Sequence, residues 1–150
     1  MKWLDLPPLW LLLHLGAVWA SAPSLPLGVS APWVVALGTA LLALGLGLMA
    51  AAVGTMWRAK TTPIPHREAS HLVDSGVFGL SRNPIYVGDA LVLAGVILRA
   101  GAPLLLPLVP AFMWVIQRRF IEPEEARLQR QFGQRFEEFC SRTPRWLLWR

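Results

Sequence analysis

The stretch Ser81-Arg82-Asn83-Pro84-Ile85-Tyr86-Val87-Gly88 joins a polar loop directly to an apolar helix. Pro84 suits the first turn of that helix, where a backbone N–H has no partner to bond. The chain before this stretch leads to one face of a membrane. The chain after it returns to the same face with a second charged cluster, Glu122-Pro123-Glu124-Glu125. We therefore predict that the two polar segments meet at one end of a helical bundle.

The composition of the 150-residue chain is that of an integral membrane protein. Hydrophobic residues make up 55% of it and charged residues only 15%, against roughly a quarter charged in soluble proteins. The length fits a single domain, residues 1–150, and is too short for two. Bilayer-spanning helices need about 20 apolar residues. We predict an all-α, integral membrane four-helix bundle, with transmembrane helices over approximately 8–21, 33–57, 84–98 and 104–120.

A further helix is predicted over residues 123–141. Its apolar residues recur at helical spacing and its charged residues lie between them, so it is amphipathic; the apolar ones are Leu128, Phe132, Phe136 and Phe139. We expect this helix on the cytoplasmic face, either along the bilayer surface or capping the bundle. Trp146-Leu147-Leu148-Trp149 is then expected to dip back into the interface. Pro107 and Pro110 are each expected to bend the fourth transmembrane helix.

The net charge of +5 is explained by membrane topology. If the N-terminus is cytoplasmic, thirteen of the 14 basic residues lie on the cytoplasmic side and only Arg99 lies opposite, as the positive-inside rule requires. We therefore expect both termini in the cytoplasm of a bacterial cell, the protein in the inner membrane, and no nucleic-acid partner. A cleavable signal over the first helix is the alternative, because Lys2 is basic and Ala20-Ser21-Ala22 is typical of a cleavage site.

Two ionisable residues fall inside predicted transmembrane helices. Asp89 lies about one turn into the third helix, and buried carboxylates in lipid are costly and often functional. A hydrogen bond to a neighbouring helix or to Arg82 would explain Asp89 equally well. For His14 we expect a neutral imidazole bonded to a neighbouring helix. Cys140 is the only cysteine, so no cysteine cluster for a metal exists and no metal site is predicted.

The sequence contains no dinucleotide-binding glycine loop, P-loop, zinc-binding HExxH or nucleophile elbow. What remains is a set of polar residues expected at the cytoplasmic end of the bundle: Arg82, Asn83, Tyr86, Glu122, Glu124 and Glu125. Arginine binds carboxylates, asparagine bonds to an adenine edge, and glutamate accepts from ribose hydroxyls or an ammonium. Such a set matches an amino acid joined to a nucleoside. The simpler alternative is that Glu124 and Glu125 complement a helix N-terminus and Arg82 anchors at the headgroups.

Two motifs in the chain resemble a known superfamily. The first is Leu72-Val73-x-Ser75-Gly76-x-Phe78-x-x-Ser81-Arg82-Asn83-Pro84-x-Tyr86-x-Gly88. The second is Glu124-Glu125-x-x-Leu128-x-x-x-Phe132-Gly133, followed by Phe136, Phe139 and Thr143-Pro144. Both are similar to motifs of the isoprenylcysteine carboxyl methyltransferase and phospholipid N-methyltransferase superfamily, and Thr61-Thr62-Pro63 resembles its bacterial branch.

This resemblance implies S-adenosylmethionine bound at the cytoplasmic face, with the methyl acceptor arriving from the bilayer. It implies cofactor-binding roles for seven residues: Arg82, Asn83, Pro84, Tyr86, Gly88, Glu124 and Glu125. Three departures are visible, since Asn83 stands where many members have His, Phe136 and Phe139 replace Tyr, and Val77 replaces Pro. Gly45-Leu46-Gly47 corresponds loosely to a glycine pair that phospholipid methyltransferases are thought to use for the cofactor.

The implied chemistry is direct methyl transfer from a sulfonium, in which positioning and water exclusion supply most of the rate. Candidate catalytic residues are Arg82, Tyr86, Asp89 and Glu125. Tyr86 is expected near the cationic sulfonium. Asp89 or Glu125 is expected to take a proton from an amine acceptor, whereas a carboxylate acceptor needs no base. The presence of Asp89 therefore favours an amine as the methyl acceptor.

Other acceptors and other activities stay open at this stage. The acceptor is a lipophilic or membrane-embedded molecule, such as an isoprenylcysteine carboxylate, a phospholipid amine, a quinone precursor or a small amphipathic xenobiotic. A sterol-reductase-like, NADPH-dependent membrane oxidoreductase is the alternative enzyme, because that group has a similar Arg-Asn-Pro-x-Tyr segment. A non-catalytic, lipid-binding membrane scaffold is the third interpretation.

Overall fold

The computed structural model describes residues 6–25, 28, 31–60 and 71–147. Within them the elements are α1 (Pro7–Ser21), η2 (Ala22–Ser24), α2 (Pro32–Arg58), η3 (Gly76–Gly79), α3 (Pro84–Arg99), η4 (Pro103–Leu105), α4 (Leu108–Ile116), η5 (Gln117–Ile121), α5 (Glu122–Phe132) and α6 (Gln134–Arg142). The features predicted at Lys2, Thr61-Thr62-Pro63 and Leu148-Trp149 lie outside the described residues. The all-helical fold that was predicted is confirmed.

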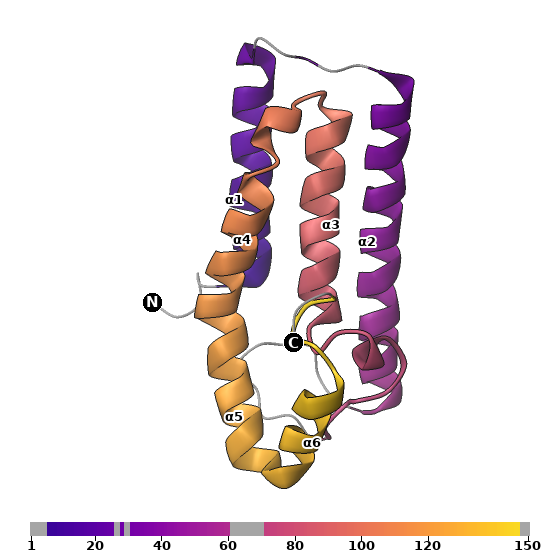
Figure 1. Ribbon diagram of the computed structural model, residues 1–150, viewed down its shortest axis with the longest axis vertical. Helices are drawn as coiled ribbons and strands as arrows, with labels where there is room; N and C mark the ends of the chain where they lie inside the picture. The colour runs from indigo at the N-terminus through magenta and orange to yellow at the C-terminus, as the bar shows by residue number, and fades with distance from the viewer. Residues whose placement is uncertain (1–5, 26–27, 29–30, 61–70, 148–150) are drawn as a thin grey trace.

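Helix α3 lies at the centre of the bundle, with α2 on one side of it and α1 and α4 on the other (Figure 1). Leu93 and Ile97 of α3 pack with Phe112 and Ile116 of α4 in a fully buried core. The side of α3 that faces α2 carries glycines, so the two backbones approach closely. A Cβ atom added at Gly45 of α2 would lie 2.6 Å from the carbonyl oxygen of Gly88 in α3. The 16-residue α3 is therefore surrounded by protein over most of its length.

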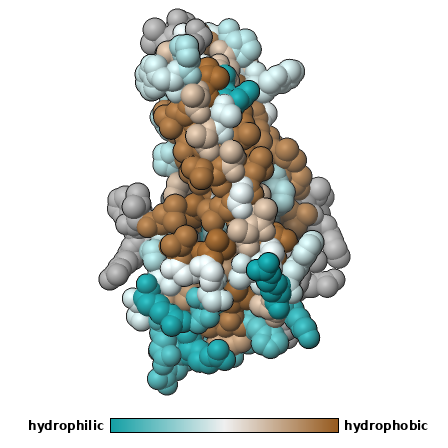
Figure 2. Space-filling view, turned by 90° about the vertical axis from the view of Figure 1, so that its right-hand side faces the viewer, coloured by the Kyte–Doolittle hydropathy of each residue, from teal (hydrophilic) through white to brown (hydrophobic). Residues whose placement is uncertain are grey.

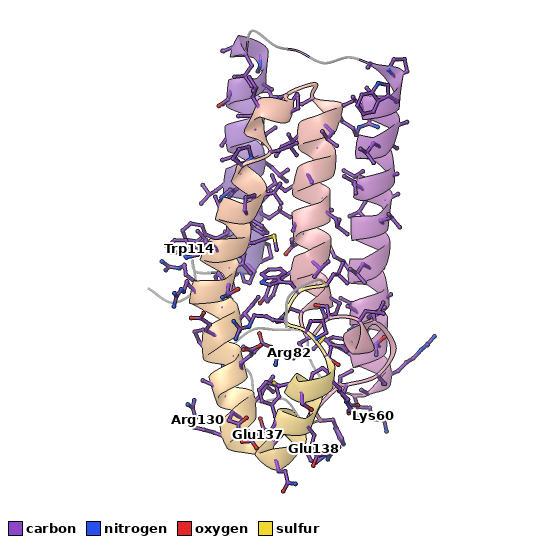
Figure 3. All side chains as sticks on the ribbon, viewed as in Figure 1. Lys60, Arg82, Trp114, Arg130, Glu137 and Glu138 are labelled. Carbon is purple, nitrogen blue, oxygen red and sulfur yellow. The ribbon has the colours of Figure 1, made fainter. Side chains whose placement is uncertain are left out.

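The outer surface of the bundle is apolar. Trp19, Trp33 and Trp57 expose 84%, 69% and 71% of their surface, which a water-soluble domain avoids. By length and composition, two helices are suited to crossing a membrane, Pro32–Arg58 and the continuous run Pro103–Phe132. Figure 2 shows hydrophobic side chains over the middle of one face and hydrophilic ones gathered at one end. Figure 3 places Lys60, Arg130, Glu137 and Glu138 at that same polar end.

The fourth predicted helix differs from the prediction in both its start and its end. The expected bends at Pro107 and Pro110 are wrong, because Pro107 caps α4 and Pro110 lies in its first turn, where the missing N–H groups have no partner in any helix. The helix also does not stop near residue 120. It passes through a single π turn, η5, directly into α5. Because Pro123 cannot donate to the carbonyl four residues earlier, the wider turn accommodates it.

The predicted amphipathic helix over 123–141 is two helices. Gly133 separates α5 from α6 with a φ of +53°, a conformation that residues with a Cβ atom rarely adopt. The turn brings Phe136 and Phe139 of α6 against Phe78 of η3 and Ala52 of α2. Of the two positions left open by the sequence, the apolar face of α6 therefore caps the polar end of the bundle.

His14 bonds within its own helix, and not to a neighbouring one as predicted. Its Nδ1 donates to the carbonyl of Trp10 at 2.8 Å. The ring lies edge-on to Phe112 of α4, with 5.3 Å between the centroids. His14 therefore helps to pack α1 against α4 and lies apart from the polar end.

Candidate functional site

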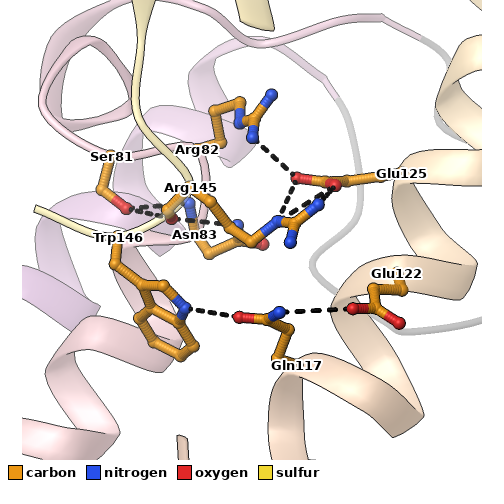
Figure 4. Close-up of polar contacts among 8 residues, drawn as sticks. All are labelled: Ser81, Arg82, Asn83, Gln117, Glu122, Glu125, Arg145 and Trp146. Carbon is orange, nitrogen blue, oxygen red and sulfur yellow. Dashed lines mark hydrogen bonds and ion pairs between the residues drawn. The ribbon is translucent and has the colours of Figure 1, made fainter. Parts of the chain in front are cut away.

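The loop before α3 is held by the segment that follows α6, although about 60 residues separate them in sequence. The Arg82 N–H donates to the carbonyl of Pro144 at 2.9 Å. The Ser81 hydroxyl and the Asn83 amide both donate to the carbonyl of Arg145, at 2.9 and 3.2 Å. The Asn83 N–H closes the arrangement by donating to the Ser81 hydroxyl (Figure 4). These bonds fix the backbone from which the Arg82 side chain extends.

Three charged side chains meet at this point, from the loop, from α5 and from the C-terminal segment. Arg82 lies 3.2 Å from the Glu125 carboxylate. Arg145 contacts both oxygens of the same carboxylate, with its Nε at 3.2 Å from each and an Nη at 2.5 Å. Hydrogen bonding to Glu125 raises the pKa of the Arg145 guanidinium. The predicted meeting of the two polar segments is confirmed by the Arg82–Glu125 contact.

The Arg82 guanidinium is enclosed but not fully bonded. Its side chain is 13% exposed and that of Glu125 15%, so solvent screens the pair weakly. Arg82 also acts on the Cys140 thiol. Burial raises the pKa of this thiol, and the charge and hydrogen bond of Arg82 lower it in part. The Nε of Arg82 is nevertheless buried, and no described residue accepts a hydrogen bond from it. Buried donors rarely stay unpaired, so this atom needs an acceptor.

A second polar chain runs beside the charged cluster. The indole N–H of Trp146 donates to the Gln117 side-chain oxygen at 3.0 Å, and the Gln117 amide donates to Glu122 at 3.2 Å. The π turn brings Gln117 and Glu122, five residues apart, onto one side of the helix. Trp146 is buried in the main core at 6% exposure. Trp146 therefore packs inside the protein, where its N–H finds a partner, and its place at the membrane interface stays a prediction.

Tyr86, Asp89 and Glu124 gather on the α3 side of the site. Tyr86 interacts electrostatically with three charged side chains: Glu124, Asp89 and Arg127. Asp89 is buried, and among the described residues it forms no ion pair; Arg82, the partner considered for it, pairs with Glu125. Glu124 lies on α5, close to Arg127. Two acids, one of them close to Arg127, thus lie near one buried tyrosine.

The remaining predicted residues, Pro84 and Gly88, lie at the start of α3. Pro84 is fully buried and occupies the first turn. Gly88 faces α2, since an added Cβ would meet Met49 and the Gly45 carbonyl. Gly45 faces α3 in the same way, while nothing lies within 4 Å of a Cβ at Gly47. The structure therefore shows Gly45 and Gly88 in helix packing, on the side of α3 away from Tyr86's acidic neighbours.

Sequence reasoning missed four residues of this site: Ser81, Gln117, Arg145 and Trp146. In the sequence, Arg145 is only one of the thirteen basic residues that the positive-inside rule explains. Ser81 and Gln117 are uncharged and have no pattern that indicates a site. One signal was present, because Arg145-Trp146 follows Pro144 immediately. A proline that ends a helix fixes the direction of the next residues, so a cation placed there was a candidate for a defined contact.

Comparison with known proteins now adds the family. A family model described as phospholipid methyltransferase matches residues 33–135. The chain belongs to this family. No curated protein and no solved structure matches the chain.

As a phospholipid methyltransferase family member, the protein is a membrane-associated methyltransferase whose substrate is related to membrane lipids. The matched range runs from the start of α2 into α6 and includes both Arg82 and Glu125. It ends before Arg145, the residue that bonds most extensively to Glu125. The geometry at Arg145 is thus a property of this chain that the family match does not cover.

Proposed function

We propose that the protein transfers a methyl group from S-adenosylmethionine to an amine in a membrane-embedded, lipid-like acceptor. The observation that carries this proposal is the Arg82–Glu125–Arg145 cluster with its buried, unpaired Arg82 Nε. The hydrogen-bond acceptor that the Arg82 Nε lacks would be the carboxylate of the amino-acid part of the methyl donor. Arginine forms charge-assisted hydrogen bonds with such a group. The protein is further proposed to lie in the bacterial inner membrane, with both termini and this site on the cytoplasmic side.

The residues present fit S-adenosylmethionine by the chemistry of their donors and acceptors. In the proposed arrangement Arg82 holds the carboxylate, Glu125 orients Arg82 and faces the ammonium, and Glu124 accepts hydrogen bonds from the ribose hydroxyls. The Asn83 side-chain oxygen is left to face an adenine amino group, because its nitrogen bonds to Arg145. Pro84 and Gly88 contribute by starting α3 and by holding it against α2.

The proposed acceptor is an amine because of the charges near Tyr86. Asp89 and Glu124 both act on Tyr86, and Asp89 has no ion-pair partner among the described residues. Two acids attract an ammonium and repel a carboxylate acceptor such as an isoprenylcysteine. S-adenosylmethionine supplies a methyl group activated by the positive sulfur.

This chain's own residues then orient the reactants and move one proton. The Tyr86 ring would lie against the positive sulfur of the bound methyl donor, which the face of an aromatic ring attracts. The Asp89 carboxylate takes the proton that the amine must lose. Both oxygens of Glu125 are engaged by arginines, so Asp89 is preferred over Glu125 as the base. The apolar core around Tyr86 keeps water out.

Ligand-dependent thermal stabilisation of the detergent-solubilised protein tests the proposal. A ligand that binds only the folded state raises the melting temperature, by about 2.7 kcal/mol of stabilisation at a hundred times its Kd. We expect S-adenosylhomocysteine to raise it and NADPH to leave it unchanged. A shift with NADPH alone would favour a sterol-reductase-like activity, and a shift with neither would favour a lipid-binding scaffold.

A further inference from the structure

Arg145 bonds to Glu125 in a way that affects what Arg82 is able to bind. We infer that Arg145 is a positioning residue: by engaging Glu125 with both ends of its guanidinium, it leaves Arg82 free to receive an anionic group of the ligand. The inference rests on the proposed function, because it assigns the anionic group to the carboxylate of the methyl donor. It concerns a residue outside the part of the chain that matches the family.

The two arginines use Glu125 unequally. Arg145 reaches both carboxylate oxygens through Nε and Nη, with its shortest contact at 2.5 Å. Arg82 contacts one oxygen, through one nitrogen, at 3.2 Å. Paired, two-bond arginine–carboxylate contacts are the stronger kind. Glu125 is therefore mainly the partner of Arg145.

This inequality has an electrostatic consequence. Two guanidinium groups face one carboxylate, so the cluster keeps an excess positive charge. That excess lies on the less engaged cation, Arg82, whose Nε is buried without an acceptor. If the Arg145 side chain is removed, Glu125 becomes free to form the two-bond contact with Arg82 instead. Arg82 is then neutralised and its unpaired donor is satisfied from within the protein.

The side chain of Arg145 is separable from the structural role of its backbone. Its carbonyl accepts the bonds from Ser81 and Asn83, and any residue at position 145 supplies that carbonyl. The neighbouring Trp146 and Pro144 make their own contacts with Gln117 and Arg82. Substitutions at Arg145 thus leave the loop before α3 held in place, which makes the side-chain effect measurable in a folded protein.

The experiment compares two ligands that differ at the amino acid. S-adenosylhomocysteine carries the carboxylate, whereas 5′-methylthioadenosine has the same nucleoside and thioether without it. We expect Arg145→Gln and Arg145→Lys to weaken S-adenosylhomocysteine binding by roughly tenfold or more and to leave 5′-methylthioadenosine binding unchanged. Lysine fails because its ammonium cannot reproduce the two-bond contact. Binding is measured by calorimetry on the full-length protein in detergent.

Arg142→Gln is the matched control, because Arg142 is an arginine at the end of α6, three residues before Arg145, and pairs with Asp74 at the exposed surface. It should leave both affinities unchanged. In the Glu125→Gln background, Arg145→Gln should cost nothing further, since Arg145 acts only through Glu125. Equal losses for both ligands, or an additive loss in the double variant, would overturn the positioning role. Absence of S-adenosylhomocysteine binding to the unaltered protein would instead count against the proposed function.

Discussion

At the scale of single residues, Asp89 is the side chain whose place is hardest to explain by structure alone. It is 4% exposed and lies one turn inside α3, and no described residue forms an ion pair with it. If Asp89 takes the proton of an amine acceptor, Asp89→Asn should lower kcat by roughly a hundredfold, the order expected for loss of a general base. The affinity for S-adenosylhomocysteine should not change, because that ligand lacks the acceptor.

This prediction is checked by single-turnover methylation assays with labelled methyl donor and a lipid extract. Asp74→Asn serves as the control, since Asp74 is also an acid but pairs with Arg142 at the surface. Unchanged turnover in Asp89→Asn would remove Asp89 from the mechanism. A large loss of S-adenosylhomocysteine affinity would indicate that Asp89 shapes the donor site and does not act as a base.

The same scale shows what the sequence was able to predict about the site. Arg82 and Glu125 were predicted to meet, because each is a charged residue in a motif next to a helix end, and the contact is present at 3.2 Å. Arg145 and Gln117 were not identified. The contact of Arg145 depends on where the chain leads after the glycine turn at position 133, and that of Gln117 depends on the π turn. Local hydrophobic periodicity predicts neither the path of the chain after Gly133 nor the presence of the π turn.

At the scale of elements, the α2–α3 contact depends on glycines spaced seven residues apart. Gly38 and Gly45 of α2 face Gly95 and Gly88 of α3, and an added Cβ at any of them would contact backbone of the other helix or the Met49 side chain. Small residues at this spacing let helices pack backbone to backbone in a membrane. The sequence presents Gly45 and Gly47 as one pair, and only the structure separates them: Gly45 is packed against α3, whereas Gly47 has open space around it.

Gly45→Ala should therefore destabilise the protein. The new methyl group would lie 2.6 Å from the Gly88 carbonyl oxygen and 3.0 Å from the Val92 side chain, and overpacking of this kind costs about 1–3 kcal/mol. We expect a melting temperature lowered by several degrees in detergent or lipid nanodiscs. Gly47→Ala, two residues along the same helix, has open space around it and should have little effect. Equal melting temperatures for the two variants would show that the helices separate more easily than their backbone distance implies.

At the scale of the whole molecule, α3 is shielded by its neighbours while α1, α2 and α4 present apolar side chains outward. Composition was sufficient to predict this inside-out arrangement, because a chain with so few charges has to cover its surface with apolar groups. Helix ends were less predictable. The chain continues past Phe120 through η5 into α5, and Gln117 in this turn bonds to both Trp146 and Glu122. These contacts join residues that hydrophobic periodicity does not single out.

The orientation of the molecule is a prediction that the charges alone support. Crossing the bilayer with the basic end outward would violate the positive-inside rule, since thirteen of the 14 basic residues belong to one side in the predicted topology. In a Cys140→Ser background, a cysteine at Ser24, exposed at the end of η2, should react with a membrane-impermeant maleimide on intact bacterial cells. A cysteine at Arg130, exposed on α5, should react only in inverted membrane vesicles. The opposite labelling pattern would put the Arg82–Glu125 cluster on the outer face, where cytoplasmic S-adenosylmethionine cannot reach it, and the proposed function would fail with it.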